Sequence, residues 1–149
     1  MTIDKDHRPE GHAEMEMASA LAAFDSKNFS HALRLFSPMA EAGNAEAQHR
    51  MAIMLQNGLA CAANEKDAFK WMSAAAQQGH AVAQHGLGFM YMEGECAEKD
   101  GMLAAHWFEK AALQGLAGSQ TTLAMMYQQG NGIEVDDEKA KYWYAKAGF

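Results

Sequence analysis

The stretch that decides the fold is residues 81–115, AVAQHGLGFMYMEGECAEKDGMLAAHWFEKAALQG. Apolar residues recur at helical spacing over 81–93, and Gly94 interrupts the pattern. After a short loop, Asp100 stands where it can cap a second helix that runs to about Gln114. The stretch therefore predicts two helices joined by a loop.

The same residue types return every 36 positions on both sides of this stretch. The clearest columns are Trp71, Trp107 and Trp143; Gly58, Gly94 and Gly130; Ala68, Ala104 and Ala140; and Gln48, Gln84 and Gln120. A period of this length is the signature of a repeat protein. Because one helix pair cannot bury its apolar face alone, we expect neighbouring pairs to stack and form a continuous core.

The columns predict an all-α protein, an α/α solenoid of four helix–turn–helix repeats with a right-handed superhelical twist. The repeats are expected at about 13–43, 44–80, 81–116 and 117–149. Their helix pairs are expected at about 13–26 with 28–42, 45–57 with 64–78, 81–93 with 100–114, and 117–129 with 136–147. Residues 1–12 are polar and are predicted to be a disordered tail.

These columns resemble the Sel1-like repeat family, relatives of the tetratricopeptide repeat. Residues 117–147 carry most of that family's pattern. The matching positions are Ala117, Leu123, Tyr127, Gly130, Gly132, Ile133, Asp136, Ala140, Trp143, Tyr144 and Ala147. The resemblance implies adaptor or scaffold work between proteins, as in bacterial signalling, envelope assembly or host contact.

Charge and hydropathy exclude several classes of partner. The net charge of −7 argues against nucleic acid, because phosphate binding needs a basic surface. No apolar run approaches the roughly 20 residues of a membrane-spanning helix. Residues 1–14 lack the apolar segment of a secretory signal, so we expect a cytoplasmic protein, or a periplasmic one if a leader has been removed.

Side chains suited to catalysis or metal binding are scattered along the sequence. His80 and His85 are five residues apart, which does not place two ligands on one helical face. Neither Cys61 nor Cys96 has a histidine near it in sequence. No phosphate-binding loop, GxSxG or HExxH motif occurs. We therefore predict no enzymatic activity, no cofactor and no metal site.

The functional prediction is a concave groove that binds a peptide or helix of a protein partner. In tetratricopeptide-like stacking, positions 2, 5, 9, 12 and 13 of each repeat, counted from Ala45, Ala81 and Ala117, face that groove. The predicted groove residues are Glu46, His49, Ile53, Gln56, Val82, His85, Phe89, Met92, Thr121, Met125, Gln128 and Gln129.

Position 9 of this groove is apolar in all three repeats, as Ile53, Phe89 and Met125. These side chains would anchor the partner, while polar neighbours such as His49, His85, Gln128 and Gln129 would fix its register. The competing interpretation is that the position 9 side chains pack between helices as ordinary core.

Two other functions remain open. The resemblance includes secreted, cysteine-rich relatives linked with penicillin binding and β-lactam hydrolysis, but this sequence lacks their cysteine pair in each repeat and has no Ser-x-x-Lys. The second is self-assembly, because Tyr142, Tyr144 and Phe149 lie in or just after the last helix, where no next pair covers them. A homodimer through the C-terminal repeat would bury these aromatic residues, unless the polar side of the helix already faces outward.

Overall fold

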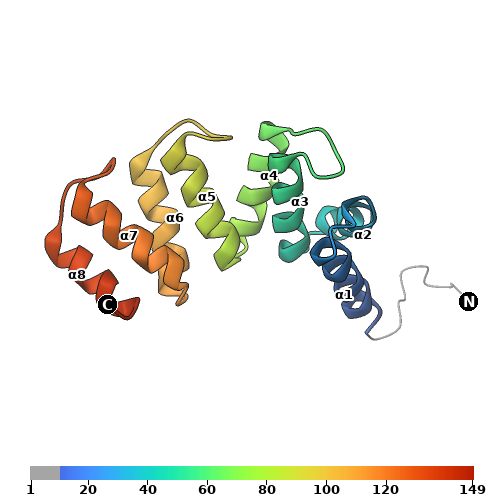
Figure 1. The fold of residues 1–149 in the computed structure, drawn as a ribbon, viewed down its shortest axis with the longest axis horizontal. Coiled ribbons are helices and arrows are strands. Elements are labelled where there is room, and N and C mark those ends of the chain that lie inside the picture. The colour runs from blue at the N-terminus through green and yellow to red at the C-terminus, as the bar shows by residue number, and fades with distance from the viewer. Residues whose placement is uncertain (1–10) are drawn as a thin grey trace, which may run out of the picture.

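The computed structural model describes residues 11–149, and these residues form α-helices without any strand. The helices are α1 (His12–Asp25), α2 (Phe29–Glu41), α3 (Ala45–Asn57), α4 (Glu65–Gln77), α5 (Ala81–Glu93), α6 (Gly101–Leu113), α7 (Ala117–Gln129) and α8 (Asp137–Lys146). They stack in pairs along one direction (Figure 1). The predicted all-α solenoid of four repeats is confirmed.

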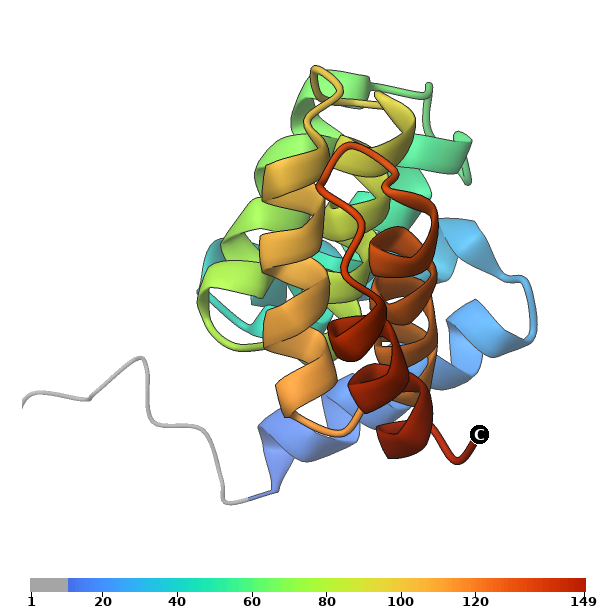
Figure 2. The ribbon, with the colours of Figure 1, turned by 90° about the vertical axis from the view of Figure 1, so that its left-hand side faces the viewer.

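Each helix packs chiefly against its neighbours in the chain. Seen from the C-terminal end, α6, α7 and α8 lie side by side (Figure 2). Of the expected tail, residues 1–10 lie outside the described part of the chain. Gly11 and His12 form the N-cap and the first residue of α1. Within residues 11–149, every helix is too short or too polar to cross a lipid bilayer.

Local signals explain where the helices begin and end. Asn64, Asp100 and Asp136 cap the second helices of the last three repeats, each accepting the backbone N–H three residues on at 3.0 Å. These bonds satisfy donors that the helix itself leaves unpaired. The first helices of the same repeats end at glycines in the left-handed conformation, Gly58, Gly94 and Gly130. The caps and stops expected from the sequence are therefore the ones observed.

Small residues form the contacts between neighbouring helices. The alanine column is buried, with exposed fractions of 0% at Ala68, 0% at Ala104 and 3% at Ala140. Beside it, Phe108 is fully buried at the centre of the core of the last two repeats. Because interiors are densely packed, such positions leave little room for a larger side chain.

The glutamine column is buried as well, and its amides tie three consecutive helices together. Gln48, Gln84 and Gln120 each donate from Nε2 to a carbonyl eight residues earlier, on the preceding helix, at 3.1–3.2 Å. Gln78 and Gln114 then donate to the side-chain oxygens of Gln48 and Gln84 at 2.8 and 2.9 Å. A polar column is tolerated in the core because its hydrogen bonds are made.

Candidate interaction groove

The predicted groove follows α3, α5 and α7, the first helices of the last three repeats. His85 on α5 reaches α7 directly, with its Nδ1 2.6 Å from the Oγ of Ser119. His49 on α3 lies against His80 at the start of α5, with ring centroids 4.9 Å apart. Side-chain contacts therefore link α3 to the N-cap of α5 and α5 to α7.

The apolar residues predicted at position 9 differ in how much solvent they meet. Phe89 is 37% exposed and Met125 is 43% exposed, whereas Ile53 is half-buried. Val82, at position 2 of the third repeat, is 47% exposed. Two of the three expected anchors thus present apolar surface to solvent, while the third is mostly enclosed by its neighbours.

Phe89 is held in place by other aromatic rings. It meets His85 edge-on at 4.8 Å and Phe108 edge-on at 5.1 Å between centroids, and His85 also meets Phe108 at 5.3 Å. Edge-to-face rings at these separations attract one another. One side of Phe89 therefore packs in the core and the other faces solvent. Its position is compatible with both interpretations of position 9, as packing between helices and as an anchor for a partner.

The remaining predicted groove residues do not converge on one point. Gln56 bonds at 3.4 Å to Glu95 in the loop after α5, and Thr121 donates its hydroxyl to a carbonyl of its own helix. Met92 packs against the core of the last two repeats. Gln128 accepts a hydrogen bond from a tyrosine of α8 at 2.8 Å, and Gln129 is exposed.

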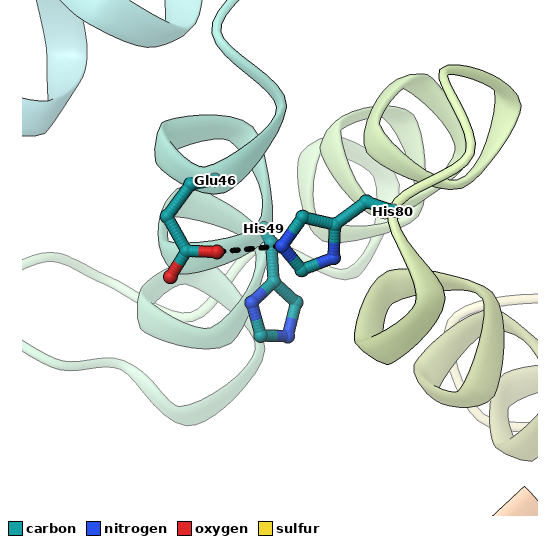
Figure 3. Close-up of side chains that lie close together, drawn as sticks. All are labelled: Glu46, His49 and His80. Atoms are coloured by element: carbon teal, nitrogen blue, oxygen red, sulfur yellow. Dashed lines mark hydrogen bonds and ion pairs between the residues drawn. The ribbon is translucent and has the colours of Figure 1, made fainter. Parts of the chain in front are cut away.

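Two predicted groove residues, Glu46 and His49, instead join His80 in a compact cluster (Figure 3). The Oε2 of Glu46 lies 2.5 Å from the Nε2 of His80, and its Oε1 accepts from the Nε of Arg50 at 2.9 Å. His49 is only 7% exposed, so its ring is buried and is not accessible to a partner in the predicted groove.

His80 makes a second contact that determines where its proton sits. Its Nδ1 accepts the backbone N–H of Ala83 at 3.0 Å and so caps α5. A ring nitrogen that accepts a hydrogen bond has no proton, so in the neutral ring the proton is on Nε2. His80 therefore donates from Nε2 to Glu46 while capping a helix from Nδ1.

Burial and neighbouring charges shift the pKa values of three groove residues. Burial lowers the pKa of His49 to about 4, with the charges of His80 and Arg50 acting in the same direction against that of Glu46. Burial alone would raise the pKa of Glu46, but hydrogen bonds from His80 and Arg50 outweigh it and hold that pKa below its usual value. Burial also lowers the pKa of His85. Both shifted histidines favour the neutral form near pH 7.

The sequence interpretation missed this cluster because it compared His80 with its neighbour His85 along one helix. The structure pairs His80, the N-cap of α5, with residues 34 and 31 positions earlier on α3. The signal that could have found it is the 36-residue column, in which His80 occupies the capping position that Asn44 holds 36 residues earlier.

A Sel1 repeat model matches the sequence at residues 23–44, 45–80, 81–116 and 117–148. The chain belongs to the Sel1 repeat family. A Sel1 repeat protein from Oxalobacter formigenes is 27% identical with a TM-score of 0.82, over 87% of this chain and 54% of that one. A protective antigen of uropathogenic Escherichia coli with an SLR fold is 36% identical with a TM-score of 0.75, over 77% of this chain and 25% of that one.

This Sel1 chain thus spans about half of the first of these structures and a quarter of the second. Cysteine rich protein B of Helicobacter pylori shares the fold at 19% identity, with a TM-score of 0.62 over 80% of this chain and 86% of that one. Comparison of the sequence with curated proteins finds no significant match.

The cysteines of this Sel1 protein are free thiols. Cys61 and Cys96 are both half-buried. Burial, followed by the nearby carboxylates of Glu65 and Glu95, raises the pKa of Cys96. A raised pKa lowers the thiolate fraction, which makes this cysteine a poor nucleophile.

The aromatic residues at the end of this Sel1 chain are partly uncovered. Tyr142 is 53% exposed and Phe149 is 83% exposed. Tyr144 is half-buried, donates its hydroxyl to Gln128 and packs edge-on against Phe149 at 6.0 Å.

A hollow of about 750 Å³ lies away from the predicted groove, between α6 and the loop before α8. Its lining includes Met102, His106, Tyr127 and Val135, none of which the sequence interpretation assigned to a binding site. None of the predicted groove residues lines this hollow.

Proposed function

We propose that the face formed by α3, α5 and α7 binds a peptide or helix of a protein partner and that the protein is a non-enzymatic adaptor. Sel1 repeats generally serve as protein-interaction modules. The observation that carries the proposal is that Phe89 and Met125, at the same position of successive repeats, are 37% and 43% exposed. Apolar side chains held at repeating positions on a rigid scaffold provide the anchors for helix-in-groove recognition.

The chemistry of the face favours an apolar partner segment with few charges. Val82 adds to the apolar surface of α5, and the half-buried His85 favours its neutral form near pH 7. Gln129 and the exposed edge of Gln128 supply neutral hydrogen-bonding groups on α7. An amphipathic helix would place its apolar side on Phe89 and Met125.

The β-lactam-binding alternative has no supporting observation in this chain. It came from relatives whose cysteines are paired within each repeat, whereas Cys61 and Cys96 are free and belong to different repeats. The raised pKa of Cys96 also opposes a nucleophilic role. Free thiols are typical of a reducing compartment, and we propose that the adaptor works in a bacterial cytoplasm.

The groove is tested with peptides selected on the purified protein from a random-peptide display library, whose Kd is then measured by fluorescence anisotropy. Met125→Ala is the decisive variant, and Met102→Ala is its matched control, because Met102 is also an exposed helical methionine but lies on α6 at 75% exposure. Loss of an apolar anchor is expected to raise Kd about tenfold.

The control should leave Kd unchanged. Phe89→Ala should weaken the same peptides, and circular dichroism checks that its helix content is retained, because Phe89 also packs against Phe108. If the selected peptides bind Met125→Ala as well as they bind the parent, or lose equal affinity for Met102→Ala, the groove is not the binding face.

We further propose that two copies can associate through the C-terminal repeat. Support comes from the exposed rings of Tyr142 and Phe149, since aromatic residues are enriched at interfaces. Sedimentation velocity at micromolar concentration should show a dimer that Tyr142→Lys dissociates. A parent protein that sediments as a monomer would exclude this contact.

A further inference from the structure

We propose that Glu46, His49 and His80 form a binding site for one divalent transition-metal ion of the Zn²⁺ type, placed where α3 meets the N-cap of α5. Each residue offers one ligand atom, and these atoms all lie within 4.8 Å of one another. Figure 3 shows the His49 ring next to the contact between Glu46 and His80. Modest side-chain movements bring atoms at this spacing to a common ion.

The donor set determines which metals fit. Two imidazole nitrogens and one carboxylate oxygen suit Zn²⁺ and its neighbours Co²⁺, Ni²⁺ and Cu²⁺, whereas Mg²⁺ and Ca²⁺ prefer oxygen ligands alone. Three protein ligands leave a fourth position for water or for a group from a partner. The side chain of Glu46 is 32% exposed, so solvent reaches the cluster from its side.

An independent observation at His49 also points to a ligand. His49 is 93% buried, and its Nδ1 finds no hydrogen-bond partner among residues 11–149. Buried polar atoms of native proteins are nearly always paired, because leaving one unpaired costs its full desolvation. A metal ion at Nδ1 supplies the missing partner. Arg50 bonds only the other oxygen of Glu46, so it does not occupy the position that the ion needs.

Binding the ion requires one rearrangement at His80. The Nε2 proton now donated to Glu46 must leave, because the ion takes that lone pair. The neutral ring then carries its proton on Nδ1, and the cap bond from the N–H of Ala83 is lost. One cap hydrogen bond and one contact with the carboxylate are exchanged for three coordinate bonds.

The consequence is a metal link between two helices. Glu46 and His49 lie one turn apart on α3, and His80 precedes the first residue of α5. The ion therefore holds α3 against the start of α5 and stabilises the packing of α5, the first helix of the third repeat, on the second repeat. This site stands whether or not the groove binds a peptide, because it needs no partner.

The test measures Zn²⁺ binding to the full metal-free chain by isothermal titration calorimetry, with visible absorption of Co²⁺ as a probe of coordination geometry. His80→Asn is the sharpest variant, because Asn44 shows that asparagine caps a helix at this column position. It keeps the cap and removes the ligand. Glu46→Gln removes the carboxylate with little change of shape. His106→Asn removes an exposed histidine on α6 and is the matched control.

The parent is expected to bind one Zn²⁺ per chain and to melt at a higher temperature with Zn²⁺ than without it. His80→Asn and Glu46→Gln should each weaken binding by about 100-fold or more, since even residues outside the coordination sphere affect affinity 10- to 100-fold. His106→Asn should bind like the parent. Circular dichroism of the metal-free variants checks that they fold. If Glu46→Gln does not fold, the test rests on His80→Asn alone.

The proposal is overturned if the parent binds no Zn²⁺. It is equally overturned if His80→Asn binds Zn²⁺ with the affinity of the parent, because the ion is then held by other histidines. A Co²⁺ spectrum that is the same in the parent and in His80→Asn would show, independently of calorimetry, that His80 is not a ligand.

Discussion

Two glycines of α5 allow a stringent test of the packing between this helix and its neighbours. Gly86 and Gly88 lie two residues apart in the middle of the helix, where each replacement by alanine gains about 1 kcal/mol of helix propensity. A methyl group at either position meets a buried side chain at 2.9 Å. The identity of that side chain decides the sign of the net effect.

The neighbour of Gly88 is rigid. A Cβ atom there would lie 2.9 Å from Cδ1 and Cε1 of Phe108, which is fully buried and held between other rings. Overpacking of this kind typically costs about 1–3 kcal/mol. After the gain in helix propensity, Gly88→Ala is expected to lower the free energy of unfolding by up to about 2 kcal/mol.

The neighbour of Gly86 is flexible. A Cβ atom there would meet the Sδ and Cε atoms of Met72, the far end of a side chain with three rotatable bonds. Rotation of that end relieves the contact, so Gly86→Ala is expected to be neutral or to stabilise by up to about 1 kcal/mol. The two variants should therefore differ by about 1–2 kcal/mol.

Urea unfolding followed by circular dichroism and by tryptophan fluorescence measures this difference. Coincident transitions from the two signals establish that the midpoints can be compared. In thermal unfolding, the same difference is expected to appear as roughly 3–6 °C in Tm. The reasoning is refuted if Gly88→Ala is as stable as Gly86→Ala, since α5 and α6 would then pack less tightly than the structure shows.

Three further predictions concern other contacts. Ala104→Leu should lower stability by about 1–3 kcal/mol because its site is fully buried, and an unchanged Tm would place Ala104 outside the helix contact. Gln84→Leu should cost about 1–3 kcal/mol because it removes two hydrogen bonds, to the carbonyl of Ala76 and from the Nε2 of Gln114, at about 0.5–1.5 kcal/mol each, whereas Gln129→Leu at an exposed site should cost little in urea unfolding. Burial lowers the pKa of His85 below 6.5, so as the pH falls this histidine is protonated in the unfolded chain before it is protonated in the folded one. The free energy of unfolding should therefore decrease as the pH drops below about 6.5 and should stay level above about pH 6.5. The buried His49, with a pKa of about 4, adds to the same slope, so His85→Gln should reduce the slope without abolishing it. A variant with the full slope of the parent would assign the proton uptake to His49 or another group.

The helix caps and the helix ends could be predicted from the sequence because these signals are local. Asp100 accepts an N–H three residues away, and Gly94 ends α5 through its own left-handed backbone, so neither needs information from distant residues. The 36-residue period then extended one helix pair to the last three repeats. These two facts predicted the helices of those repeats to within about a residue at each end, which is the usual uncertainty of such boundaries.

The partial exposure of two predicted groove residues was also predictable in outline. Periodicity placed Phe89 and Met125 on the same face of successive helices, and the structure leaves both partly exposed. What periodicity could not state is how much of each side chain its neighbours cover. Ile53 occupies the same position of an earlier repeat and is half-buried, because the covering side chains differ from one repeat to the next.

The sequence by itself determined the fold class and the approximate ends of the helices, since these follow from spacing and from local hydrogen bonding. Only the tertiary structure decided that His49 is buried, that Phe89 belongs partly to the core, and that His80 meets Glu46 rather than His85. Those contacts join residues 19 to 34 positions apart in the sequence. They depend on the angle and distance at which one repeat stacks on the next, and the packing of many side chains at once sets that geometry.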